Sequence, residues 1–152
     1  MWLTILAAAT AALTAINGGV FFAFSTFILP AARRMPAVEA VHAFQAINRT
    51  VPRSLYLPVF LLSGLGGAVT AVVALLVQGS GWLIAGGATA FVALVVSFAV
   101  NIPRNNALGT VTDADAVAGW QSYVGPWAAA NHLRTLLCFA AVAFLVAGLL
   151  GV

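Results

Sequence analysis

The sequence predicts an all-α protein, a polytopic membrane four-helix bundle, and composition is the first reason. Of its 152 residues, 63% are hydrophobic and 6% are charged, whereas a soluble domain is about 45–50% apolar and about 25% charged. The six arginines and three acidic residues cannot cover a water-facing surface. This composition excludes a soluble globule, a disordered chain and a nucleic-acid binder that uses a broad basic face.

Long uncharged runs are the second reason, and they give the spans in order. A helix needs about 20 apolar residues to cross the hydrocarbon core. We expect spans at about residues 2–29, 55–77, 82–100 and 133–152, within a single transmembrane domain, 1–152. None of these runs alternates as the strands of a membrane barrel do. The first run is too long for a signal peptide and lacks a basic start, so we expect it to be retained.

The long connections are expected to hold two further helical segments. Pro36 opens the first, a short amphipathic helix at the membrane interface, which ends near Asn48. Phe44 lies on its apolar side, next to Asn48. The polar side of this helix carries Glu39, His42 and Arg49. Asp113 is expected to cap a second segment, which begins at Ala114 and precedes the last span.

The positions of the arginines predict the orientation. All six lie in the first and third connections or just inside the fourth span, which face the same side in a four-span chain. Basic residues favour the cytoplasmic side of a membrane. We therefore expect a multi-pass protein of the cell's inner (plasma) membrane, with both termini outside and the long loops in the cytoplasm.

Several polar residues of the spans are expected to face the interior of the bundle. Asn17 shares a helix face with Thr10, Thr14 and Ser25. An amide in hydrocarbon needs a partner, so Asn17 either contacts a ligand in a cavity or donates to another helix. A second polar face ends the third span and consists of Ser97, Asn101, Arg104 and Asn105. It either lines a cavity or caps a helix end.

A third face precedes and enters the fourth span. On an uninterrupted helix, one side would carry Trp120, Tyr123, Trp127, Asn131, Arg134 and Cys138. The tryptophans are typical of an aromatic belt at the headgroup level. That interpretation does not explain a histidine and an arginine at the mouth of a span, where titratable groups are costly and indicate a functional site.

Four segments together resemble the DUF1772 family of anthrone oxygenase-like membrane proteins. The segments are Gly18–Ser25, Gln45–Arg49, Asn101–Asn106 and the run from Trp120 through Tyr123 and Trp127 to Asn131-His132-Leu133-Arg134-Thr135. The resemblance covers nearly the whole chain. Its most specific parts are the Asn-x-Pro-x-Asn-Asn block and the Asn-His-x-Arg-Thr block.

The resemblance implies an oxygenase that converts an anthrone to an anthraquinone with O2, without a metal, a flavin or another cofactor. The carbanion of an anthrone can itself reduce O2, so the protein need only assist deprotonation and stabilise the oxyanion. His132 is the expected base, with Arg134 and Asn131 as the other catalytic residues. The expected substrate-binding residues are Asn17, Asn48, Arg49, Asn101, Asn105, Trp120, Tyr123 and Trp127. The partners are a lipophilic small molecule, which enters from the bilayer, and lipid.

Other functions stay open at this point. The same polar cavity could hold a quinone-like or lipid ligand as a carrier, without chemistry. His42 and His132 could ligate a haem, although no motif supports it. The small residues of the spans could pack against another membrane protein or against a second copy of the chain as a homo-oligomer. The single cysteine, Cys138, excludes a cysteine-based metal cluster.

Overall fold

The computed structural model describes residues 1–151, and within them the chain is helical with no strands. Four helical runs are long and apolar enough to cross a membrane. Their bounds are Trp2–Ala32, Tyr56–Leu76, Gly81–Leu108 and Asp113–Leu150. These runs confirm the predicted fold class of a helical, multi-pass membrane protein.

The described part of the chain contains eleven helical elements, of which α3 and η2 lie between the first and second runs. In chain order, the elements are α1 (Trp2–Ala23), η1 (Phe24–Ile28), α2 (Leu29–Ala32), α3 (Ala37–Thr50), η2 (Val51–Arg53), α4 (Tyr56–Leu76), α5 (Gly81–Val96), η3 (Ser97–Asn101), α6 (Ile102–Leu108), η4 (Asp113–Asp115) and α7 (Ala116–Leu150).

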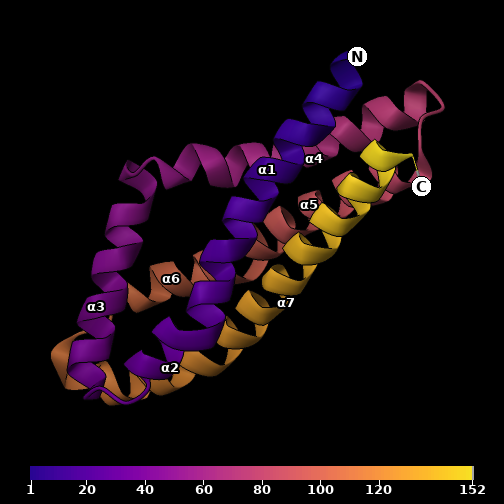
Figure 1. The fold of residues 1–152 in the computed structure, drawn as a ribbon. Coiled ribbons are helices and arrows are strands. Elements are labelled where there is room, and N and C mark those ends of the chain that lie inside the picture. Colours follow the sequence, from indigo (N-terminus) through magenta and orange to yellow (C-terminus); the bar gives the residue numbers. More distant parts are fainter. Residues whose placement is uncertain (152) are drawn as a thin grey trace.

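The four spans form a closed bundle around small side chains. Helices α1 and α5 each pack against both α4 and α7 (Figure 1). Where α4 crosses α5, Gly67 lies directly against Gly87, and a Cβ atom on Gly67 would lie 2.6 Å from the Gly87 carbonyl oxygen. Helices in lipid associate through such close backbone contact, because no hydrophobic force drives them together there.

Two π-helical segments interrupt the spans, and each ends two residues before a proline. In η1 the Leu29 amide donates to the Phe24 carbonyl, and in η3 the Ile102 amide donates to the Ser97 carbonyl. A proline ring inside an α-helix clashes with the carbonyl four residues earlier. Widening the helix by one residue before Pro30 and Pro103 accommodates the ring without a break.

The helices therefore continue past the boundaries that the prolines suggested. The first run reaches Ala32, beyond Pro30, and the third reaches Leu108, beyond Pro103. The helical segment predicted before the last span joins it as one helix, α7, which contains Pro126. A spanning helix tolerates an internal proline because neighbouring groups can satisfy the freed carbonyl. Helix α7 begins at Ala116 and not at Ala114, and the predicted cap, Asp113, lies in η4 and pairs with His42 instead.

The amphipathic helix α3 lies over the end of the bundle, where it packs on α7 and α6. The amide nitrogen of Gln45 donates to the carbonyl oxygens of Leu108 and Val111, both at 3.0 Å. At the exposed edge, His42 Nε2 lies 2.7 Å from Asp113 Oδ1. These contacts join the first long connection to the third.

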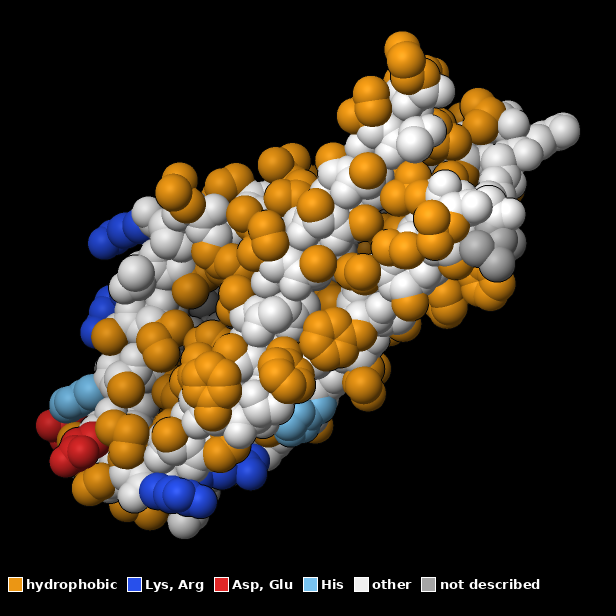
Figure 2. Space-filling view, viewed as in Figure 1, with side chains coloured by type: hydrophobic (Ala, Val, Ile, Leu, Met, Phe, Trp, Pro, Cys, Tyr) orange, Lys and Arg blue, Asp and Glu red, His pale blue; other side chains and the backbone are white. Residues whose placement is uncertain are grey.

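Apolar and charged side chains occupy different parts of the outer surface. Figure 2 shows apolar side chains along the length of the bundle, with the arginine, acidic and histidine side chains gathered toward one end. A surface of this kind suits lipid along the bundle and water at its charged end.

Candidate functional site

A cavity of about 480 Å³ lies at the charged end of the bundle, beneath α3. Drug-sized ligands occupy cavities of this size, roughly 300–1,000 Å³, with a mostly apolar lining and a few polar groups. The cavity reaches the surface at the exposed residues Pro52 and Asn106. Its lining comes from α1, η1, α3, η2, α4, η3, α6 and α7: Val20, Phe21, Phe24, Phe44, Ile47, Asn48, Val51, Pro52, Tyr56, Leu57, Phe60, Ser97, Asn101, Ile102, Asn105, Asn106, Trp127, Asn131 and Arg134.

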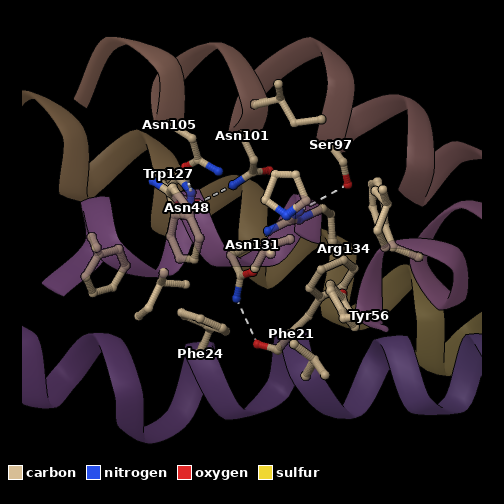
Figure 3. A pocket seen from close by; sticks show the side chains of 18 of the residues that line it. Phe21, Phe24, Asn48, Tyr56, Ser97, Asn101, Asn105, Trp127, Asn131 and Arg134 are labelled. Atoms are coloured by element: carbon tan, nitrogen blue, oxygen red, sulfur yellow. Dashed lines mark hydrogen bonds between the residues drawn. The ribbon is translucent and has the colours of Figure 1, made fainter. Parts of the chain in front are cut away.

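Arg134 is the charged group of this cavity, and it is 6% exposed. Its Nη1 donates to Ser97 Oγ at 3.1 Å and its Nη2 donates to Asn131 Oδ1 at 2.6 Å (Figure 3). Its Cζ lies 4.0 Å from the ring centre of Phe21, within the range of a cation–π contact. All of these partners are neutral.

None of the three acidic side chains reaches this cation. The one ion pair among residues 1–151 joins His42 to Asp113 at the exposed edge. Buried charges in proteins are normally paired, because removing an ion from water costs several kcal/mol per ion. The cavity therefore holds a buried positive charge that its own chain leaves without a counter-ion within the described residues.

Both neutral partners are fixed as acceptors for Arg134. Asn131 Nδ2 donates to the Phe21 carbonyl and to Ser25 Oγ, both at 2.8 Å, which turns Oδ1 toward the guanidinium. The Ser97 hydroxyl donates to the Ala93 carbonyl at 2.9 Å, so its oxygen accepts from Arg134. Both π-helical segments therefore help to position Arg134. Ser97 of η3 contacts it directly, and Ser25 of η1 acts through Asn131.

Three buried polar atoms of the cavity lining have no hydrogen-bond partner. They are Arg134 Nε, Asn48 Nδ2 and Asn101 Oδ1. A buried polar group without a partner costs about 1–3 kcal/mol, and native structures contain few of them. Two donors and one acceptor at one cavity indicate a ligand that supplies the complementary atoms.

Aromatic rings form the wall of the cavity that faces α3. Trp120, Tyr123 and Trp127 stack in series along α7, with ring centres 5.7 and 5.8 Å apart. Phe44 of α3 meets all three rings edge-on. The Tyr123 hydroxyl and the Trp127 indole both donate to Asn105 Oδ1, at 2.9 and 2.8 Å. The wall is therefore rigid.

A hydrocarbon core that begins near Trp2 would place the cavity near its far edge. Phe21 is roughly 28 Å from Trp2 along α1, at about 1.5 Å per residue. The hydrocarbon core is about 30 Å thick. A ligand in the cavity would therefore have its apolar part near the acyl chains and its polar part near the charged end of the protein.

The structure brings many of the sequence-predicted site residues into this one lining. They are Asn48, Asn101, Asn105, Trp127, Asn131 and Arg134. Trp120 and Tyr123 do not line it, because they lie behind Trp127 and Phe44 in the aromatic wall. Tyr123 instead borders a second, smaller hollow with Arg104.

Asn17 does not line the cavity, contrary to its predicted role in substrate binding. Its Nδ2 donates to Ser63 Oγ at 3.0 Å, and its Oδ1 accepts from the Tyr56 hydroxyl. Neighbouring helices thus satisfy the amide, which is the interhelical alternative considered for this residue. Asn17 contributes to the cavity indirectly, by holding Tyr56 in the lining.

His132 and Arg49 also lie outside the cavity lining, and both side chains are exposed. Each is adjacent in sequence to a lining residue, Asn131 or Asn48. Adjacent positions on a helix point about 100° apart, so the helix that turns one side chain inward turns its neighbour away. The role of His132 as a base remains a prediction, without a contact to the cavity.

The resemblance implies anthrone oxidation, and on that expectation His132→Ala should keep close to the wild-type rate, because this side chain does not reach the cavity. A general base typically contributes about 10²–10⁴-fold to a rate. Oxygen uptake by both proteins at equal concentration would measure the difference. A loss in that range, with an unchanged helical spectrum, would contradict this expectation and restore the catalytic role of His132.

The sequence did not single out several residues of the lining, most notably Phe44, Tyr56 and Phe60. Phe44 has the pattern of a residue that packs an interfacial helix onto the bundle, and Tyr56 has the pattern of an aromatic residue at the start of a span. Both patterns are common without a ligand. Ser97 shared a face with Asn101, and this was the one available signal for its position beside Arg134.

The fold and the cavity define a polytopic helical membrane protein with an arginine-containing pocket at one end of its bundle. The sequence model of the anthrone oxygenase family matches residues 42–144, which is more than half of the chain. The chain therefore belongs to the anthrone oxygenase family, also called the DUF1772 family. No curated protein and no solved structure matches the chain.

Proposed function

We propose that the protein oxidises a lipophilic anthrone-type substrate with O2, and that the cavity binds this substrate as its enolate. The observation that carries the proposal is the buried guanidinium of Arg134, which has only neutral partners among the described residues. An enolate oxygen supplies the missing negative charge. Family membership supports the same chemistry.

The lining of the cavity suits an aromatic anion. Trp127 of α7, Phe21 of α1 and Phe24 of η1 supply aromatic rings to it. Arg134 Nε and Asn48 Nδ2 are free to donate to the oxygen that carries the charge. Donors that are already oriented stabilise a developing oxyanion without reorganisation.

The reaction consumes one O2 and releases one water for each anthrone. The methylene carbon of the anthrone loses a proton and gives the enolate, whose electrons reduce O2 as a C–O bond forms. The resulting hydroperoxide loses the second hydrogen of that carbon and its terminal oxygen as water, which leaves the carbonyl of the anthraquinone. The described lining contains no carboxylate or imidazole, so we assign the protein the binding of the enolate, and solvent accepts the proton.

The mouth of the cavity favours entry from the bilayer. Val20, Ile47, Val51 and Leu57 are apolar and half-buried lining residues. They belong to α1, α3, η2 and α4. Most of the polar lining residues lie on η3, α6 and α7, and Asn48 of α3 and Tyr56 of α4 are the others. A lipophilic substrate that enters from the bilayer would thus meet these polar groups with its oxygen-bearing end.

We also propose that the charged end of the bundle is cytoplasmic, in the inner (plasma) membrane, with both termini outside. All six arginines belong to the two long connections at that end or to the adjacent turn of α7. The positive-inside bias supports this orientation. Labelling of single cysteines placed at Arg33 and at Gln78 in intact cells would test it, and labelling of the Arg33 position from outside would contradict it.

Oxygen uptake by the purified protein in lipid nanodiscs tests the proposed function. We expect uptake well above the uncatalysed rate with an anthrone, with one O2 consumed for each quinone formed. Quinone formation followed by absorbance gives the stoichiometry. Tight binding of anthrone and quinone without any acceleration would instead support a carrier for quinone-like ligands.

A further inference from the structure

We propose that Asn101 determines specificity, because its Oδ1 accepts a hydrogen bond from a ring hydroxyl of the ligand that Arg134 binds. This inference rests on the proposed function for the kind of ligand, but its geometry is independent of turnover. Asn101 is 1% exposed and lies on η3 in the cavity lining. Its Oδ1 has no partner.

The hydrogen-bond partner of Asn101 determines the orientation of its amide. Its nitrogen donates to the Trp127 carbonyl oxygen at 3.2 Å (Figure 3). A carbonyl can only accept, so the nitrogen must be the atom that faces Trp127. The oxygen of Asn101 is therefore the atom left without a partner, and reversing the amide would place two acceptors against each other.

This oxygen is the acceptor among the unpartnered buried atoms of the cavity. Arg134 Nε and Asn48 Nδ2 are donors. Asn105 Oδ1 is already occupied by the Tyr123 hydroxyl and the Trp127 indole. The Oδ1 of Asn131 accepts from Arg134, and the Ser97 oxygen does the same. A ligand donor thus finds one free, buried amide oxygen, on Asn101.

A site that contains a buried acceptor distinguishes ligands by what they place against it. A ligand hydroxyl restores the hydrogen bond that Asn101 lacks, whereas a hydrogen atom or a methyl ether leaves the acceptor buried and unpaired. An unsatisfied buried group costs enough to reject such analogues. The cavity should therefore prefer a ring-hydroxylated anthrone to both the unsubstituted compound and the methyl ether.

Ligand binding and turnover should be measured separately, on the full-length protein in nanodiscs. The ligands are ring-hydroxylated anthraquinones, their methyl ethers and unsubstituted anthraquinone, with quenching of tryptophan fluorescence as the binding signal. For at least one hydroxyl position, we expect the wild type to bind the hydroxylated compound about 10- to 100-fold more tightly than both analogues. The corresponding anthrones provide the turnover measurement through oxygen uptake.

Two variants assign this preference to Asn101. In Asn101→Leu and Asn101→Ala, the affinity for the hydroxylated ligand divided by the affinity for the unsubstituted ligand should fall toward one. The affinity for the unsubstituted ligand itself should stay the same or improve. A purely structural role would weaken all ligands equally. Gln121→Leu, at an exposed position of α7 outside the cavity lining, should retain the wild-type ratio.

The outcomes separate this inference from the proposed function. Equal affinity of the wild type for all three kinds of ligand would overturn the role of Asn101, even if anthrones are oxidised. A clear preference without oxidation would support Asn101 and overturn the enzyme. If neither Asn101 variant folds, the affinities of the wild type for the three kinds of ligand still decide the inference. Absence of any binding would overturn both proposals.

Discussion

Arg134→Met should reduce anthrone oxidation by about 10²–10³-fold, which is typical for the loss of one oxyanion donor. The variant removes the buried cation and both donors that point toward Ser97 and Asn131. An enolate in the cavity would then meet no compensating charge. Oxygen uptake at saturating anthrone, followed across pH, measures the loss.

Arg134→Lys separates charge from geometry at the same position. Lysine keeps the positive charge but not the planar fork that contacts two acceptors at once, so its rate should fall between that of Arg134→Met and that of the wild type. Arg49→Met is the matched control, because Arg49 is exposed and outside the cavity lining. Near-normal oxidation by Arg134→Met would overturn the proposed function of the cavity.

Gly67→Ala should lower the stability of the bundle, because the added methyl group meets the backbone of the neighbouring helix. The new Cβ would lie 2.6 Å from the Gly87 carbonyl oxygen and 2.8 Å from Ala90 Cβ. Backbone cannot move aside as a flexible side chain can, so α4 and α5 must separate. Overpacking typically costs about 1–3 kcal/mol. Unfolding in mixed micelles by increasing SDS, followed by circular dichroism, measures the change.

Gly19→Ala is the control for Gly67→Ala, because nothing lies within 4 Å of the new Cβ in α1. Alanine is favoured over glycine in a helix by up to about 1 kcal/mol, so this variant should match or exceed the wild type in stability. If the two variants unfold at the same SDS fraction, the close crossing of α4 and α5 does not determine stability.

The fold was predictable because hydropathy and arginine placement are strong signals in a chain of this composition. Four spans, the interfacial helix and the absence of strands from residues 1–151 all agree with the sequence analysis. The ends of the spans were less predictable. A proline indicates a possible break, but the sequence does not say whether the helix ends or widens, as it does before Pro30 and Pro103.

The sequence could place polar residues of the spans in the cavity lining where no other helix satisfies them. It could not do so where another helix supplies their hydrogen-bond partners. Asn131, Arg134 and Asn101 are costly in a span, and all three line the cavity. Asn17 was equally costly, but Ser63 and Tyr56 on α4 satisfy it. That pairing depends on how α1 meets α4, which periodicity along a single helix cannot reveal.

The widened turn of η3 has a consequence for chain length. A π-helical segment contains one residue more than the α-helix it replaces, and one residue corresponds to about 100° of rotation. Deleting Ala99 would therefore restore a regular helix and change the rotation between Ser97 and Asn101. With Asn101 held in the cavity lining, Ser97 would turn away from Arg134. The span would keep its hydropathy and still cross the membrane. Its two ends, however, would no longer face the same cavity, so the exact number of residues in this helix matters as much as its composition.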